Sequence, residues 1–106
     1  MSSDSCLSRV KWNSPTHVEI TGVFVHGFYA RPCGCDEVIK IGLNEELRAS
    51  REWGRITSTI MESGGRVAVG AELVGSMSTF NSQPDLLHIQ EISAKSGICN
   101  GGGIVP

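Results

Sequence analysis

Apolar and polar residues alternate along two early stretches of the chain, residues 16–28 and 37–43. This period of two is typical of β-strands that bury one face. Gly22 interrupts the first stretch and predicts a bulge or a sharp bend there. Residues 29–36 contain Pro32 and are predicted to form the loop between the two strands. The alternating apolar positions are Val18, Ile20, Phe24, Ile39, Ile41 and Leu43.

Residues 44–63 have the spacing of an amphipathic helix, with apolar residues recurring at steps of three and four. Asn44 is a favourable N-cap, and the two glutamates that follow it suit the positive end of the helix dipole. Gly64 and Gly65 are typical of a helix C-terminus. We therefore predict one helix over residues 44–63, with an inward face formed by Ala49, Trp53, Ile56 and Ile60.

The second half of the chain predicts two further strands. Residues 66–74 alternate strictly, residues 75–85 are expected to form a polar linker, and residues 86–92 alternate again. At 106 residues, with 40% apolar and 19% charged content, the chain is long enough for one globular domain. We expect a flexible arm over residues 1–15, the domain over residues 16–95 and a glycine-rich tail over residues 96–106.

The order of strands, one helix and further strands favours an α+β, mostly β fold, either a small antiparallel sheet or a barrel with one packed helix. It resembles the oligonucleotide/oligosaccharide-binding (OB) barrel, whose helix lies between the third and fourth of five strands. The resemblance is carried by the glycine-bent first strand, the helix, the segment GGRVAVGAELVG and the closing LLHIQEI. Two sources are open for the fifth strand, the arm around Val10–Trp12 or a split of the long first strand. Other α+β arrangements also stay open.

The chain carries 9 Lys and Arg against 11 Asp and Glu, a formal net charge of -2. This balance disfavours non-specific binding to nucleic acid or to anionic membranes. The N-terminus has no pattern of a secretory signal, and no apolar run is long enough for a membrane span, so we expect a cytoplasmic protein. Because a domain of this size is marginally stable by itself, we also expect a homodimer.

The four cysteines are expected to be free thiols, because the cytoplasm keeps thiols reduced. Cys33 and Cys35, with His26 on the preceding strand, offer three candidate ligands for a metal ion. A second ligand cluster is missing, which favours two small loop thiols without a metal. The same residues with Glu19 are the one candidate set for nucleophilic catalysis, and the sequence contains nothing that would orient them.

The OB resemblance implies that ligands bind the loops between the first and second and the fourth and fifth strands, near residues 27–37 and 75–85. Aromatic, cationic and amide side chains in these loops are candidates to stack on and hydrogen-bond a ligand. The alternative is that the two phenylalanines fill the barrel ends or a dimer interface. The candidate ligand-binding residues are Phe28, Tyr29, Arg31, Phe80 and Asn81.

The functional hypothesis that follows is a non-enzymatic binding or assembly module that recognises a small polar ligand or a peptide. The glycines of GGRVAVG lack the lysine and the strand-to-helix context of a nucleotide site, so no cofactor is implied. The competing hypothesis is a small cytoplasmic metal-binding protein or enzyme that uses His26, Cys33 and Cys35.

Overall fold

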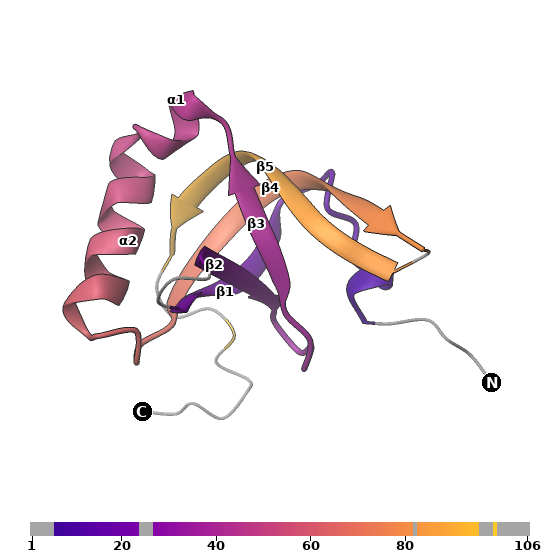
Figure 1. Cartoon of the computed structure of the whole chain (residues 1–106), viewed down its shortest axis with the longest axis horizontal. Coiled ribbons are helices and arrows are strands. Elements are labelled where there is room, and N and C mark those ends of the chain that lie inside the picture. Colours follow the sequence, from indigo (N-terminus) through magenta and orange to yellow (C-terminus); the bar gives the residue numbers. More distant parts are fainter. Residues whose placement is uncertain (1–5, 24–26, 82, 96–98, 100–106) are drawn as a thin grey trace.

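Five strands close into a barrel in this computed structural model, which describes residues 6–23, 27–81, 83–95 and 99. The strands are β1 (Thr16–Val23), β2 (Gly27–Pro32), β3 (Ile39–Leu43), β4 (Val69–Phe80) and β5 (Gln83–Ala94). They follow the order β1-β2-β3-β5-β4, and β4 pairs with β1 to close the barrel (Figure 1). The β3–β5 pair is parallel, and the other pairs of described strands are antiparallel. The prediction of a mostly β barrel with one helical segment between the third and fourth strands is confirmed.

The fifth strand comes from a split of the long first stretch, the second of the two sources that the sequence left open. β1 and β2 pair without a register shift, with Gly22 opposite Phe28, so the bulge predicted at Gly22 is not present. Gly22 instead leaves room for its neighbours, because a Cβ there would lie 3.0 Å from side-chain atoms of both Phe28 and Ile60. The loop predicted over residues 29–36 is wrong in its first half, since Tyr29–Pro32 belong to β2.

Two consecutive helices occupy the place of the single predicted one, α1 (Glu45–Arg48) and α2 (Arg51–Glu62). The Asn44 side chain accepts a hydrogen bond from the Leu47 backbone amide, and Ser50 caps α2 in the same way. Ala49 lies exposed between the helices rather than on the inward face. The other predicted apolar positions of α2 are buried against the barrel, namely Trp53, Ile56 and Ile60. No helix among the described residues is long and apolar enough to cross a membrane.

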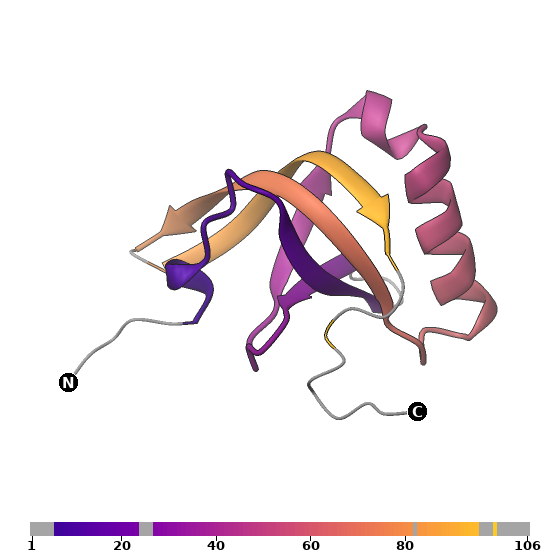
Figure 2. The same cartoon turned by 180° about the vertical axis from the view of Figure 1, so that it is seen from behind.

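β4 and β5 form one long hairpin, so the polar linker predicted over residues 75–85 is wrong. β4 continues to Phe80 through its pairing with β5, and Met77 still packs against the core. Pairing with β1 ends at Leu73, and pairing with β3 begins at Leu87. Within the described chain, residues 76–80 of β4 thus pair only with β5, residues 83–86 of β5 pair only with β4, and Asn81 lies in the turn between them. We call this projecting part of the hairpin the ribbon arm (Figures 1 and 2).

The N-terminal segment lies on the side of the barrel away from α2 (Figures 1 and 2). It contains a short 3-10 helix, Leu7–Arg9, and it buries Leu7 and Trp12, each 5% exposed, in the main core. The Trp12 carbonyl accepts a hydrogen bond of 2.7 Å from the Gly75 amide of β4. Residues 6–12, assigned from sequence to a flexible arm, are therefore part of the packed domain. Of the predicted tail, residues 96–106, only Cys99 lies in the described part of the chain.

Candidate functional site

The turn after β2, Cys33-Gly34-Cys35, is joined by disulfides to two cysteines that are distant in the sequence. Cys35 forms a disulfide with Cys6, and Cys33 forms one with Cys99, with Cα atoms 5.9 and 4.9 Å apart. The expectation of free thiols is wrong for this structure, in which every cysteine is paired. Sequence reasoning missed these pairs because the cysteines lie 29 and 66 residues apart and meet only in the folded barrel.

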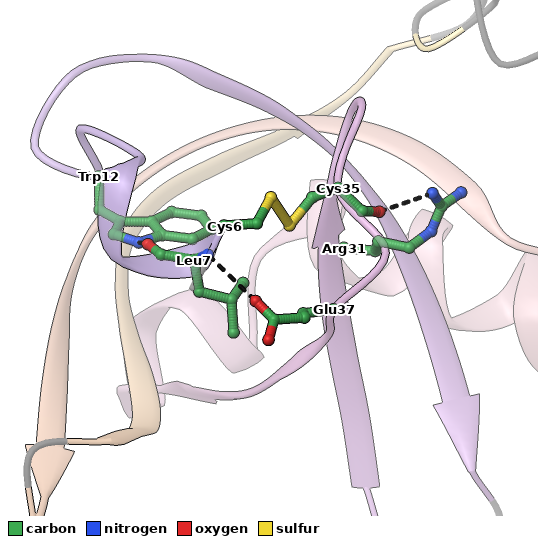
Figure 3. Close-up of a disulfide and its surroundings, with 6 residues drawn as sticks. All are labelled: Cys6, Leu7, Trp12, Arg31, Cys35 and Glu37. Atoms are coloured by element: carbon green, nitrogen blue, oxygen red, sulfur yellow. Dashed lines mark hydrogen bonds between the residues drawn. A yellow bond between two sulfur atoms is a disulfide. The ribbon is translucent and has the colours of Figure 1, made fainter. Parts of the chain in front are cut away.

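Polar contacts on both sides of the Cys6–Cys35 disulfide fix the turn (Figure 3). Arg31 donates a hydrogen bond of 3.0 Å from Nη1 to the Cys35 carbonyl, and its Nη2 pairs with Glu19 Oε1. On the other side, the Leu7 amide donates to Glu37 Oε1 at 3.4 Å. Arg31, predicted as a ligand-binding residue, is thus occupied in bracing the disulfide-linked turn.

With both disulfides formed, the candidate metal or catalytic site has no free thiolate. Cys33 and Cys35 are each in a disulfide, so neither sulfur is a free thiolate that could ligate a metal or attack a substrate. His26 lies outside the described residues. Glu19, the third member of the catalytic candidate set, is ion-paired with Arg31. Among the residues that are described, no three His, Cys, Asp or Glu side chains lie close enough together to hold a metal ion.

Phe28 and Tyr29 point to opposite sides of β2, as neighbouring residues in a strand do. The Phe28 ring meets Trp53 of α2 edge-on, with ring centroids 5.1 Å apart and planes at 77°. Phe28 therefore fills space between the barrel and α2. This is a packing role, the kind of alternative to ligand binding that the sequence left open for the two phenylalanines. Tyr29 lies on the outer side of the barrel between Thr21 of β1 and Lys40 of β3, its partners in register. A Cβ built at Gly27 would lie 3.5 Å from Lys40 Cε, so the Lys40 side chain extends toward Gly27.

Phe80 and Asn81 lie at the tip of the ribbon arm. Phe80 is 69% exposed, and Asn81 has a positive φ of 56°, which a hairpin turn requires of one of its residues. The five candidate ligand-binding residues thus lie in three different surroundings. Phe28 lies against the helix, Tyr29 and Arg31 lie on the outer side of β2, and Phe80 and Asn81 lie at the tip.

The outer face of β4 joins the tip to a surface hollow. Both register shifts of the β4–β5 pair skip a residue of β5, so side chains of β4 alternate without interruption and Val74 and Phe80 share the outer face. The hollow has a volume of about 300 Å³. Sequence reasoning missed it because it depends on the β4–β5 register and on the approach of the chain before β1. It is lined by Pro15, Glu72, Leu73, Val74, Glu91, Ile92 and Ser93.

Comparison of the chain with protein-family models, with curated proteins and with solved structures finds no significant match in any of the three. Functional interpretation therefore depends on the barrel and on its own exposed groups. A barrel topology alone does not define a function, because the same fold hosts many unrelated ones. The most informative groups are those whose exposure the fold does not require, above all Phe80.

Proposed function

We propose that this chain is a non-enzymatic binding or assembly module that contacts a polypeptide partner through the ribbon arm. The observation that carries the proposal is Phe80, whose side chain is 69% exposed at the tip of a two-stranded ribbon extending beyond the barrel wall. An exposed aromatic side chain gains free energy when a partner removes it from water, and aromatic residues are enriched among the dominant contacts of interfaces.

The composition of the ribbon arm supports a polypeptide over nucleic acid. Residues 76–86 carry one charged side chain, Asp85, among hydroxyl and amide side chains. Binding to a phosphate backbone relies on lysine and arginine, and this segment has none. Hydroxyl and amide groups around one aromatic residue are the composition of many protein-binding loops.

Selection of a displayed library of random linear peptides tests the proposal. The disulfide-bonded chain serves as bait, and each selected peptide is measured again with Phe80→Ser and with the control Met61→Ser. Met61 is 59% exposed at the end of α2, so this variant removes an exposed apolar side chain elsewhere. We expect peptides that bind the wild type and the control but not Phe80→Ser. Selection that yields only peptides indifferent to Phe80 would contradict the proposal.

A small polar ligand on the outer side of β2 and β3 is a second candidate. Tyr29 and Lys40 are paired in register there, which sets a tyrosine and a lysine side chain on the same face of the sheet. Such a pair suits a ligand with a ring and an anionic group. Tyr29→Ala and Lys40→Ala should then both weaken a ligand found by thermal-shift screening of anionic metabolites, and a ligand indifferent to both variants would exclude this face.

The two disulfides also bear on the compartment. We infer that the chain matures in an oxidising compartment rather than in the cytoplasm, where disulfides are rare. Alkylation of protein recovered from its own cells tests this inference. The chain should take up alkyl groups on its 4 cysteines only after reduction. Complete alkylation before reduction would place the functional form in a reducing environment.

A further inference from the structure

We propose that the partner of the ribbon arm is a second copy of this chain, with Phe80 of one copy entering the hollow of the next. This inference rests on the proposed function and names its partner. The Phe80 side chain, which we call the knob, and the hollow lie on the same molecule, but Phe80 cannot reach the hollow of its own chain. Val74 and Phe80 are six positions apart in β4, and at about 3.3 Å per residue they lie roughly 20 Å from each other.

The hollow is large enough for one aromatic side chain, and part of its lining is apolar. Its volume of about 300 Å³ is at the lower end of the range for small-molecule sites, roughly 300–1,000 Å³. Leu73 and Ile92, both buried members of the core, contribute to its lining, and Val74 adds a half-buried apolar side chain. A ring seated there would replace contact with water by contact with apolar atoms.

The tip carries polar side chains that can bind a carboxylate of the hollow. Glu72 and Glu91 line the hollow, and Glu72 is already ion-paired with Lys95 and His17. The tip around Phe80 carries no charge at Thr79, Asn81 or Gln83. The one charged residue of the ribbon arm, Asp85, lies further along β5. Docking through Phe80 can therefore leave Asp85 outside the hollow, and the side-chain amides of Asn81 and Gln83 are suitable donors to the Glu91 carboxylate.

The contact is heterologous, because it joins two different surfaces of the chain. Such a contact leaves one free tip and one free hollow on every dimer, so it continues into larger assemblies unless a ring closes. The small area of one tip and one hollow is below that of a standard stable interface, about 1,600 Å². We therefore expect association that is reversible and increases with protein concentration.

Sedimentation velocity of the disulfide-bonded chain over a concentration series tests the inference with two complementary variants. Phe80→Ser removes the knob and leaves the hollow, whereas Val74→Trp fills the hollow and leaves the knob. Each variant alone should weaken self-association by at least about tenfold, the size expected for a central aromatic contact. Met61→Ser is the matched control and should associate like the wild type.

Mixing the two variants gives the deciding result. Phe80→Ser has an intact hollow and Val74→Trp has an intact knob, so together they should form a one-to-one heterodimer that grows no further. Glu91→Trp, at an exposed position of the hollow, replaces Val74→Trp if circular dichroism shows that the latter is not folded. A wild type that stays monomeric at the highest concentration, or a mixture without heterodimer, overturns the inference. Peptides that depend on Phe80 would in that case still support the proposed function.

Discussion

At the scale of single residues, Gly75 shows how one position shapes the hairpin. A Cβ built at Gly75 would lie 2.5 Å from the His88 carbonyl oxygen, a backbone atom that cannot move without disturbing β5. The Gly75 amide also donates to the Trp12 carbonyl, which joins the N-terminal segment to β4. Gly75 therefore allows β4 to run close to β5 at the first register shift.

We predict that Gly75→Ala lowers the free energy of unfolding by about 1–3 kcal/mol, the usual cost of forcing an extra methyl group into packed structure. Gly54→Ala is the matched control, because nothing lies within 4 Å of a Cβ at that helical position. The control should raise stability by up to about 1 kcal/mol, since alanine favours helix over glycine. Urea unfolding of the oxidised chains measures both, and equal effects of the two substitutions would contradict this role of Gly75.

At the scale of elements, an internal N-cap divides into two helices a segment that the apolar spacing predicts as one. The steps of three and four over residues 44–63 are compatible with one helix, and Asn44 does begin one. Ser50, however, adopts an extended conformation and its hydroxyl accepts a hydrogen bond from the Trp53 amide, so a second helix begins there. The new start lets Trp53 and the apolar residues after it face the barrel.

We predict that Ser50→Ala destabilises the chain by about 1 kcal/mol, as loss of a serine N-cap does. Ser58→Ala, an exposed position inside α2, is the control and should be neutral or slightly stabilising. Thermal unfolding followed by circular dichroism compares the two variants. If Ser50→Ala unfolds at the same temperature as Ser58→Ala, the Ser50 hydroxyl contributes nothing as a cap.

At the scale of the whole molecule, the two disulfides tie the N-terminal segment and Cys99 to one turn of the barrel. They span 29 and 66 residues, so each restricts a long segment of the unfolded chain. The chain-entropy model assigns roughly 4 kcal/mol to each closed loop of this length. The sum is comparable with the whole stability of a small domain, about 5–15 kcal/mol.

We therefore predict that reduction by a dithiol moves the urea midpoint strongly toward zero and leaves the chain largely unfolded at physiological temperature. Trp12 and Trp53 are both buried in the oxidised fold, so their fluorescence reports the loss of packing. Alkylated reduced protein keeps the bonds from forming again during the measurement. An alkylated chain whose midpoint equals that of the oxidised chain would show that the disulfides do not stabilise the fold.

Local patterns in the sequence predicted much of the fold and little of the candidate site. Alternation identified the residues that face the barrel interior, such as Val18, Ile20 and Leu73, and the caps and glycines marked the helical segment. Boundaries failed where a pattern continues through a turn, as in the split of residues 16–28 into β1 and β2. The exposure of Phe80 was not predictable, because residues 75–85 show no apolar alternation that marks them as a hairpin.

The sequence by itself determined the class of fold, the helical segment and the identity of most core positions, because these depend on residues a few places apart. The tertiary structure decided which cysteines pair, which of Phe28 and Tyr29 faces the helix, and that the ribbon arm leaves the barrel wall. These features depend on distances between residues far apart in the chain, such as Cys33 and Cys99. Barrel closure sets those distances, and no local pattern contains them.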